Sequence, residues 1–297
     1  MYEPVGVVGA GNVGTALAMA WKNKGYSLSG VCCRTEKSAR EAAKRLDVPF
    51  FLNPAEVASR SEIVLITTPD REITSVCNYI AENQGFRQGQ VVLHTSGAHT
   101  CELLEPARKE GAGVLSLHPL QTFPSVDTGF NNLPGSYFTL EGEEQALKVG
   151  EELVSALEGN ALTIPTEMKP IYHASACVAC NYFVALLDLS LKMMEEVGVS
   201  REKALPALMP LVEGTLANVK KVGVPQGLTG PIDRGDASTV ESHVFKLKEK
   251  MPSVLDLYRQ LGNYTAQVAS EKGTLHEEEK NNIKFALGYE GNEGEKQ

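Results

Sequence analysis

The sequence has no excess of positive charge and no long apolar run. Its 297 residues include 28 Lys and Arg against 37 Asp and Glu, which gives a formal net charge of −9. Without a basic patch the chain has nothing to hold a nucleic-acid backbone, so nucleic acid is excluded as an expected partner. No basic segment followed by an apolar core opens the chain, and no run reaches the roughly 20 apolar residues that span a bilayer. We therefore expect a cytoplasmic protein with no membrane partner.

The six cysteines lack the pattern of a disulfide framework or a metal site. Cys32 and Cys33 are adjacent and could pair only with strain, which predicts reduced thiols in a reducing compartment. Cys177-x-x-Cys180 has metal or redox spacing, but it lies in a helical segment and no second such pair occurs. We expect these two thiols to pack in the protein, and we expect no metal.

The order of apolar segments divides the chain into two halves. Through about residue 165, short apolar strands alternate with helical segments, which predicts an open, mostly parallel sheet covered by helices. Helical periodicity then dominates, beginning with a long helix from Pro170 to Val197. Further helices are expected at Arg201 to Val222, Thr239 to Lys250 and Pro252 to Gly273. We predict an α/β domain at residues 1–165, an all-helical domain at 166–287 and a disordered polar tail at 288–297.

A glycine-rich turn, Gly9-Ala10-Gly11-Asn12-Val13-Gly14, separates the first apolar run from an alanine-rich helix. Gly9 permits a tight turn, Gly11 lets backbone approach a pyrophosphate, and Gly14 lets the helix pack on the strand. The helix N-terminus then presents N–H groups and a positive dipole end to phosphate. The pattern predicts a Rossmann-type doubly wound parallel sheet that binds a dinucleotide at Gly9, Gly11, Asn12, Val13 and Gly14.

The end of the second predicted strand indicates which dinucleotide binds. NAD sites usually carry Asp or Glu about 20 residues beyond the glycines, where it accepts a hydrogen bond from the ribose 2′-hydroxyl. This chain has Arg34 at that distance, followed by Thr35. A guanidinium can grip a 2′-phosphate with two parallel hydrogen bonds, and Thr35 offers a further donor, so we predict NADP(H). The alternative is an ordinary surface arginine after a strand.

Three later strands end in polar residues that should lie at the cofactor crevice, because ligands bind outside the carboxyl ends of parallel strands. Thr67, Thr68 and Pro69 are expected on the nicotinamide side. Ser96 could hold a substrate carboxylate or simply cap the next helix. His118, which is followed by a proline, is a candidate catalytic group.

The start of the long helix carries an unexpectedly polar face that includes Lys169, His173 and Asn181. Hydride addition to a C=O or C=N bond needs a donor at the developing alkoxide or amine. His and Lys have suitable protonation chemistry for that task, and Asn has a fixed amide. We predict that His173 and Asn181 are catalytic and that Lys169 binds substrate. The alternative for His173 is a histidine satisfied by backbone or water.

A glycine- and proline-rich loop, Leu228 to Asp236, separates two of the later helices. Pro231 stiffens this loop, and Arg234 offers a forked donor for a carboxylate. We predict that Arg234 binds substrate. In the alternative interpretation Arg234 pairs with Asp233 or Asp236 and only fixes the loop.

Seven motifs in one order carry a family resemblance, and they are G-A-G-N-V-G, C-R-T, T-T-P-D, H-T-S-G-A, S-L-H-P-L-Q-T-F, Y-H-A-S-A-C-V-A-C-N-Y and L-T-G-P-I-D-R-G-D. Together they resemble the bacterial Rossmann-like oxidoreductases whose C-terminal half is a helical domain of unknown function. The wider group is similar to pyrroline-5-carboxylate reductase, ketopantoate reductase and the 6-phosphogluconate and β-hydroxyacid dehydrogenases. The resemblance implies a dinucleotide domain followed by a helical domain that often dimerises, so we expect a homodimer.

The resemblance does not transfer one mechanism intact. The β-hydroxyacid dehydrogenases use a Lys with an Asn four positions later on the first long helix. This chain has His173 and Cys177 at that spacing, with Asn181 eight positions on. The pair His118-Pro119 resembles the motif of prephenate dehydrogenases, whose histidine acts on a substrate hydroxyl.

These observations leave three hypotheses for the function. The first is an NADPH-dependent reductase of a small 2-oxo acid, with 2-dehydropantoate (ketopantoate) as the first candidate, because some similar proteins are understood to act as alternative ketopantoate reductases. The second is reduction of a cyclic imine such as pyrroline-5-carboxylate, where a protonated C=N needs less acid catalysis. The third, motivated by the missing Lys-Asn spacing, is a non-catalytic NADP(H)-binding sensor or scaffold.

Overall fold

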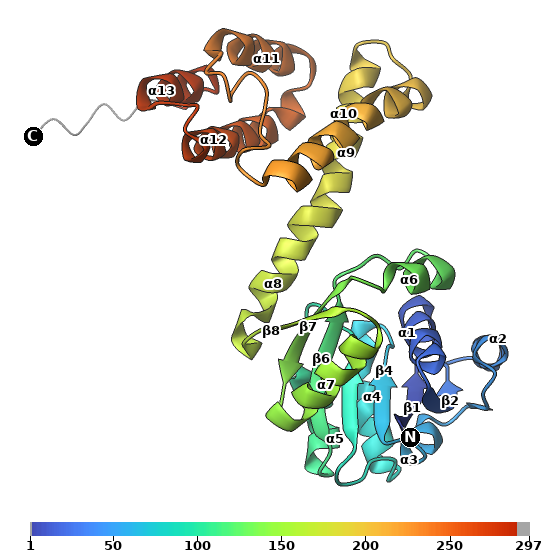
Figure 1. Ribbon diagram of the computed structural model, residues 1–297. Helices are drawn as coiled ribbons and strands as arrows, with labels where there is room; N and C mark the ends of the chain where they lie inside the picture. The colour runs from blue at the N-terminus through green and yellow to red at the C-terminus, as the bar shows by residue number, and fades with distance from the viewer. Residues whose placement is uncertain (1, 290–297) are drawn as a thin grey trace, which may run out of the picture. The chain divides into compact units, whose positions relative to one another are not determined.

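The computed structural model describes residues 2–289, and the chain divides into two compact units, Met1–Tyr182 and Phe183–Gln297. We call them unit 1 and unit 2. Unit 1 is an α/β domain, and the described part of unit 2 is helical (Figure 1). The predicted fold class, an α/β half followed by a helical half, is confirmed.

Unit 1 is built on one eight-stranded sheet with the order β3-β2-β1-β4-β5-β6-β7-β8. The strands are β1 Tyr2–Val8, β2 Tyr26–Cys32, β3 Phe50–Phe51, β4 Ile63–Ile66, β5 Val91–His94, β6 Gly113–Pro119, β7 Tyr137–Gly142 and β8 Asn160–Thr163. Only the β6–β7 pair is antiparallel, and the other neighbours run parallel. The order from β3 to β6 is that of a doubly wound dinucleotide-binding sheet, with the switch point between β1 and β4.

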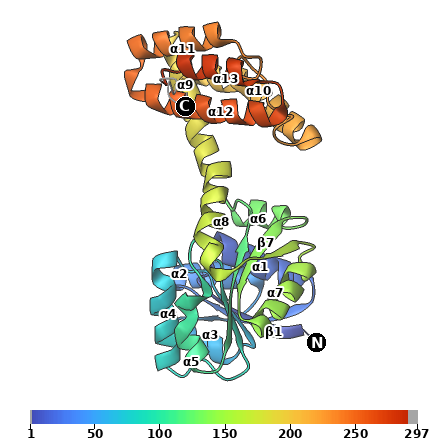
Figure 2. The same cartoon turned by 90° about the vertical axis from the view of Figure 1, so that its left-hand side faces the viewer.

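Helices cover both faces of this sheet. They are α1 Asn12–Asn23, α2 Glu36–Leu46, α3 Pro54–Ser59, α4 Asp70–Glu82, α5 Glu105–Lys109, α6 Val126–Asn132 and α7 Glu144–Ala156, with a 3-10 turn η1 at Cys101–Leu104. Helices α1 and α7 lie on one face, and α3, α4 and α5 lie on the other (Figure 2). Helix α6 was not expected from the sequence; its start is fixed by Ser125, whose hydroxyl accepts a hydrogen bond from Thr128 N at 3.1 Å.

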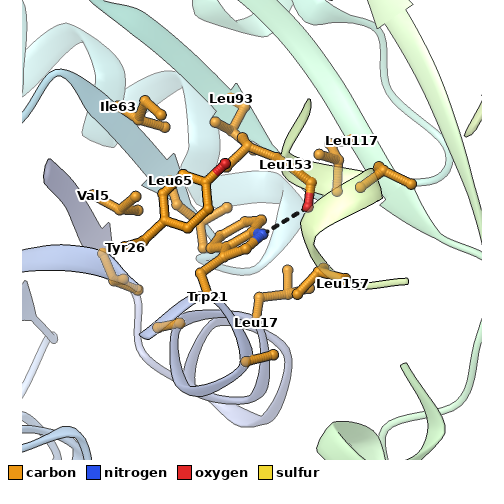
Figure 3. Packing of buried hydrophobic residues seen from close by; sticks show 14 of the residues in the cluster. Val5, Leu17, Trp21, Tyr26, Ile63, Leu65, Leu93, Leu117, Leu153 and Leu157 are labelled. Carbon is orange, nitrogen blue, oxygen red and sulfur yellow. Dashed lines mark hydrogen bonds between the residues drawn. The ribbon is translucent and has the colours of Figure 1, made fainter. Parts of the chain in front are cut away.

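The core on the α1 face is organised around Trp21, which is fully buried. Its indole Nε1 donates a hydrogen bond to the backbone oxygen of Leu153 on α7 at 3.0 Å, while Leu17 and Leu65 pack around the ring (Figure 3). Burying an apolar side chain of this size stabilises the fold by about 1.5–3 kcal/mol, so this contact ties α1 and α7 to the same sheet face. The glycine turn, which immediately precedes α1, is therefore fixed in position relative to the sheet.

A long helical stretch runs from Thr166 to Glu196, close to the predicted range. It consists of a 3-10 turn η2 Thr166–Met168, α8 Lys169–Ala176, a π-helical turn η3 Cys177–Asn181 and α9 Tyr182–Glu196. Units 1 and 2 divide inside it, after Tyr182. Within residues 2–289 this stretch alone is long and apolar enough to cross a membrane, with a mean hydropathy of 1.6, so the expectation that no segment would qualify is wrong. Core helices of soluble proteins meet the same criterion, and the finding by itself assigns no membrane.

The remaining helices of unit 2 are α10 Arg201–Val222, α11 Ala237–Lys250, α12 Leu255–Lys272 and α13 Glu277–Ala286, with a 3-10 turn η4 at Pro252–Val254. The first three match the predicted ranges closely. Helix α13 lies inside the range 166–287 predicted to be helical, and Ile283 on its inner face is fully buried. Most of the predicted disordered tail, residues 290–297, lies outside the described residues. Tyr289 belongs to the end of α13 instead, because its backbone N–H donates to Lys284 O at 3.0 Å.

Candidate functional site

The glycine turn has the geometry that its three glycines predict. Gly9 has φ +91°, and a Cβ there would lie 2.7 Å from the backbone nitrogen of Thr68, so only glycine fits. A Cβ on Gly11 would have nothing nearer than 4.0 Å, which leaves its backbone open to a ligand. A Cβ on Gly14 would overlap the Thr67 hydroxyl, so this glycine lets α1 approach β4. The Thr67 hydroxyl donates to Gly9 O at 2.7 Å and pins the turn.

A pocket of about 830 Å³ opens over this turn. Of the residues predicted to bind cofactor, eight line it: Gly9, Gly11, Val13, Arg34, Thr35, Thr67, Thr68 and Pro69. The volume falls in the range typical of cofactor pockets. The Thr68 hydroxyl oxygen is buried and has no hydrogen-bond partner within residues 2–289, so the pocket wall holds a polar atom that a ligand could satisfy. An open glycine cradle and an unpartnered polar atom fit a dinucleotide phosphate.

Two of the predicted cofactor residues have structural side-chain roles. The Asn12 amide donates to the backbone oxygens of Phe123 and Pro124 at 3.1 and 3.2 Å, so only its backbone N–H at the start of α1 remains for a phosphate. Gly14 packs against Thr67 and does not line the pocket. Arg34, in contrast, is exposed at the pocket wall and forms no ion pair with any other described residue.

The carboxyl ends of β4, β5 and β6 carry polar residues side by side, because these strands are neighbours and run parallel. Thr95 lines the pocket, and the Ser96 hydroxyl donates to Asp70 Oδ2, another pocket residue, at 2.8 Å. Gly97 then lies against His118, the penultimate residue of β6. Three consecutive residues therefore connect the cofactor pocket to a histidine.

Two histidines meet at Gly97. A Cβ on Gly97 would lie 2.7 Å from both His118 Nε2 and His173 Nδ1, so a larger residue there would displace both rings. The rings pack edge to face with centroids 6.1 Å apart. His118 Nδ1 hydrogen-bonds the Tyr172 hydroxyl at 2.7 Å, and His173 Nε2 lies 3.6 Å from the sulfur of Cys177. His173 Nδ1 is buried and unpartnered among the described residues, which marks a place for a ligand atom.

The environment of His118 keeps its imidazole neutral. Burial first, and then the nearby Lys169 and His173, lower the pKa of His118 from 6.5 to about 4, although Asp70 acts in the opposite direction. At neutral pH this ring offers one N–H donor and one acceptor nitrogen. A perturbed histidine beside a pocket is a candidate functional group on physical grounds.

Lys169 does not face the pocket. Only 1% of its side chain is exposed, and its ammonium contacts the Ser116 hydroxyl and, at 3.4 Å, Glu141 Oε2. Burial lowers the pKa of Lys169. Glu141 also accepts hydrogen bonds from Cys101 N and the Thr166 hydroxyl, both at 2.9 Å. Burial alone would raise the pKa of Glu141, but these donors and the Lys169 charge hold it below its ordinary value. The ammonium is thus engaged inside the protein, in part by Ser116 of β6, the strand that also carries His118.

The hydroxyl of Ser96 is also engaged within the protein. Besides donating to Asp70, it accepts a hydrogen bond from His99 N at 3.1 Å within the loop, whereas the next helix, η1, has Thr100 at its N-cap and no side-chain cap. His94 is fully buried between Thr100 O and Ser96 N, as expected for a core histidine at the end of a strand. Sequence reasoning missed Asp70, Gly97 and Glu141; only Asp70, directly after Thr-Thr-Pro at a strand end, carried a usable signal.

The last two predicted site residues, Asn181 as a catalytic group and Arg234 as a substrate ligand, are exposed. Asn181 lies in the π-helical turn, a kind of local helix irregularity that is frequent at functional sites. Cys180, in the same turn, is exposed and does not pack as expected. Arg234 is exposed on unit 2, where Lys272, not Arg234, pairs with Asp233 at 2.8 Å.

Asp236, the other proposed partner of Arg234, accepts a hydrogen bond from Thr239 N at 3.1 Å and caps α11. The loop is therefore fixed without any ion pair of Arg234 among the described residues. This leaves the guanidinium free for a ligand.

Two known domain families match successive parts of the sequence. Residues 3–119 match the Rossmann-like domain, and residues 136–265 match a domain of unknown function (DUF2520). The chain therefore belongs to the proteins that join a Rossmann-like domain to this second domain, as the order of its motifs predicts. No curated protein matches the sequence.

Solved structures share this fold over nearly the whole chain. Protein TM1727 from Thermotoga maritima is 26% identical, with a TM-score of 0.73 over 91% of this chain and 99% of that one. A candidate NADP oxidoreductase from Bacteroides fragilis, BF3122, is 24% identical, with a TM-score of 0.69 over 90% and 98%. Pyrroline carboxylate reductase from Plasmodium falciparum with NADP bound is 16% identical, with a TM-score of 0.57 over 95% and 98%. At these identities the likeness establishes the fold, and function is argued from the site.

Proposed function

We propose that this protein is an NADP(H)-dependent oxidoreductase that reduces a small 2-oxo acid, with 2-dehydropantoate as the first candidate substrate. The observation that carries the proposal is the run Thr95-Ser96-Gly97, which joins a dinucleotide-sized pocket to the pair His118 and His173. A reactive group next to a nicotinamide pocket, with nitrogen atoms available for hydrogen bonds, is what reduction of a carbonyl requires.

The choice of NADP(H) rests on Arg34 and on the related folds. Arg34 and Thr35 stand at the end of β2, where the adenosine ribose of a bound dinucleotide lies in this fold, and no carboxylate takes their place. Two of the structures with this fold are named as an NADP oxidoreductase or as having NADP bound. The bound NADPH would supply the hydride, and this chain's residues would bind it through Gly11, the α1 N-terminus and Thr68.

Each candidate residue is given a proposed role in proton supply or substrate binding. His118 and His173 lie closest to the shared space at Gly97, so they hold the substrate oxygen and supply its proton. Asn181 is proposed to contact the substrate, and Arg234 on unit 2 is proposed to bind a carboxylate. Lys169 and Ser96 act as positioning residues, because their polar atoms are engaged within the protein.

The test is a panel of 2-oxo acids, including 2-dehydropantoate, incubated with NADPH and with NADH while absorbance of the reduced nicotinamide is followed. We expect substrate-dependent oxidation of NADPH, and a His118→Gln protein that binds NADPH but turns over much more slowly. Tight NADPH binding with no oxidation on any substrate would contradict the proposal and favour a cofactor-binding sensor.

A second candidate, reduction of a cyclic imine, is favoured by one specific observation. Because the pKa of His118 is lowered to about 4, the ring is neutral at pH 7 and carries no readily released proton. A protonated C=N bond needs no proton from the protein during hydride addition, so a neutral site suits it. Imine reductases and pyrroline-5-carboxylate reductases also share this fold. Faster oxidation of NADPH with pyrroline-5-carboxylate than with every 2-oxo acid would establish this alternative.

We further propose that the protein is a cytoplasmic homodimer with no membrane partner. Large apolar side chains on α9 and α10 are exposed in the single chain, among them Val184, Leu211 and Leu216. A second copy is the simplest cover for such residues, since patches of this kind mark interfaces. Light scattering of detergent-free protein should give twice the chain mass. A monomer that binds lipid vesicles would contradict both parts of the proposal.

A further inference from the structure

Tyr172 is the one side chain that hydrogen-bonds the ring of His118 among the described residues. Its hydroxyl lies 2.7 Å from Nδ1, and the two rings pack edge to face with centroids 5.7 Å apart. Tyr172 precedes His173 on α8, so one helix turn supplies both neighbours of His118. Nδ1 is thereby occupied, and Nε2 is the atom that faces Gly97 and the unpartnered Nδ1 of His173.

We infer that Tyr172 is the proton source of the site and that His118 relays its hydroxyl proton to the substrate. This inference deepens the proposed function and rests on it. Tyr172 acts through His118, so it is a positioning and relay residue, and His118 is the group that touches substrate.

The direction of the hydrogen bond follows from relative acidity. A phenol is a stronger acid than the N–H of a neutral imidazole, and an imidazole nitrogen is a stronger base than a phenol oxygen. The Tyr172 hydroxyl therefore donates to Nδ1 of His118. This fixes the tautomer with its hydrogen on Nε2, pointing into the space beside Gly97 where a substrate oxygen would accept it.

His118 alone cannot supply a proton to the substrate without becoming an anion, and a relay from Tyr172 avoids this. Burial first, and then Lys169, His173 and His94, lower the pKa of His118 by more than Asp70 raises it, so the ring is neutral at pH 7. A neutral imidazole that gives up its Nε2 proton becomes an imidazolate unless Nδ1 gains a proton at the same time. The Tyr172 hydroxyl is placed to supply that proton.

The step balances as follows. A hydride from NADPH forms the new C–H bond, and the C=O π pair moves onto oxygen. That oxygen takes the Nε2 proton of His118, while Nδ1 takes the hydroxyl proton of Tyr172. The phenolate that remains is a weaker base than the alkoxide it replaced. It takes its proton back from Nδ1 of His118 while water reprotonates Nε2, which restores the starting tautomer. Burial raises the pKa of Tyr172, which favours this return to the neutral phenol.

Tyr172→Phe removes the hydroxyl alone and gives the first test. On a 2-oxo acid we expect kcat to fall by roughly a hundredfold, the usual scale for general acid catalysis, with NADPH affinity unchanged. The solvent deuterium isotope effect of the wild-type protein should show two protons in motion, and that of the variant one. Tyr137→Phe, a matched change at an exposed tyrosine on β7, should leave kcat unaltered. Full activity of the Tyr172→Phe protein, with an unaltered isotope effect, would overturn the relay.

The second test does not depend on turnover. Nitrogen-15 NMR of the histidine rings, with the His118 signals assigned from a His118→Gln protein, should show Nε2 protonated and Nδ1 accepting in the wild type. Tyr172→Phe should shift the His118 signals toward a mixture of tautomers. A wild-type ring protonated on Nδ1 would overturn the inference. If no substrate oxidises NADPH, the proposed function fails, whereas the NMR result still decides the direction of the Tyr172–His118 bond.

Discussion

The two units differ in what they bury. Unit 1 encloses polar groups together with their partners: Lys169 with Glu141, and His94 between two backbone groups. The described part of unit 2 encloses fewer such groups, among them Asp233 with Lys272. Helix α9 buries only Leu191 and α10 only Ala204, and the core of unit 2 is a small cluster on α11, α12, α13 and their connections. A polar interior holds catalytic groups in fixed positions, whereas exposed apolar helices serve association. On the proposals above, most of the chemistry depends on residues of unit 1, and association depends on the exposed apolar helices of unit 2.

The largest expected loss of stability follows from breaking the buried ion pair of unit 1, Lys169 with Glu141. Lys169→Met leaves the Glu141 carboxylate buried without its counter-charge, which should lower the free energy of unfolding by about 3–5 kcal/mol. Trp21, the one tryptophan of the chain, is fully buried in unit 1, so its fluorescence during urea unfolding reports on that unit.

The control for that change is Lys148→Met, which breaks an exposed pair with Glu144 and should cost less than about 1 kcal/mol. Adding Glu141→Gln to Lys169→Met should restore most of the loss, because the second change removes the stranded charge. Equal losses in Lys169→Met and Lys148→Met would show that the buried pair is not a special feature of unit 1.

The next largest effect is the dependence of the stability of unit 1 on pH. Burial lowers the pKa of His94 from 6.5 to about 4. Between these values the unfolded chain binds a proton at His94 that the folded chain does not, so stability is complete above pH 6.5 and declines as the pH falls toward 4. The full decline is on the order of 3 kcal/mol. The Trp21 unfolding midpoint in urea should show it.

His94→Gln should flatten that profile while lowering the stability at pH 7. The exposed His243 of unit 2 is the matched site, and His243→Gln should leave the profile unchanged. An equal slope in wild type and His94→Gln would show that other groups set the acid sensitivity.

The features predictable from sequence are those set by local chemistry. Helix α10 has the predicted ends, and the glycine turn has the predicted roles. Helix α6 was missed because its sequence, V-D-T-G-F-N-N, contains Gly and two Asn, which are poor helix formers. Its formation depends on contacts with α1 instead.

The site was only partly predictable because it depends on partners distant in sequence. Lys169 and His173 share a helix face by spacing, yet Lys169 is buried on Glu141 whereas His173 reaches Gly97. No local pattern identifies Glu141 as the carboxylate that takes Lys169, since 28 residues separate them. The relay partner Tyr172 likewise depends on where β6 delivers His118.

Substitution of the proposed catalytic groups of unit 1 should change the activation free energy of the reaction by less than the changes above. It should leave the stability unaltered. His173→Gln should lower turnover by roughly a hundredfold, because it removes a ring nitrogen that faces the substrate space, and Asn181→Ala should do the same by removing an oriented amide. NADPH affinity and the Trp21 unfolding midpoint should stay close to wild type. A lower midpoint with full activity per folded molecule would instead make these residues structural.

The smallest expected effect compares one exposed arginine in each unit. Arg34→Asp should weaken NADPH binding about tenfold to a hundredfold, because a charge-assisted pair with the 2′-phosphate is replaced by repulsion. NADH binding should improve, since a carboxylate can accept a hydrogen bond from the free 2′-hydroxyl. Arg234→Asp makes the same charge change on unit 2 and should raise KM for the carboxylate substrate while leaving the NADPH to NADH ratio alone. Titration of both cofactors against both variants measures this directly. An unchanged ratio in Arg34→Asp would remove Arg34 from the adenosine ribose, and a shifted ratio in Arg234→Asp would show that the division of work between the units is wrong.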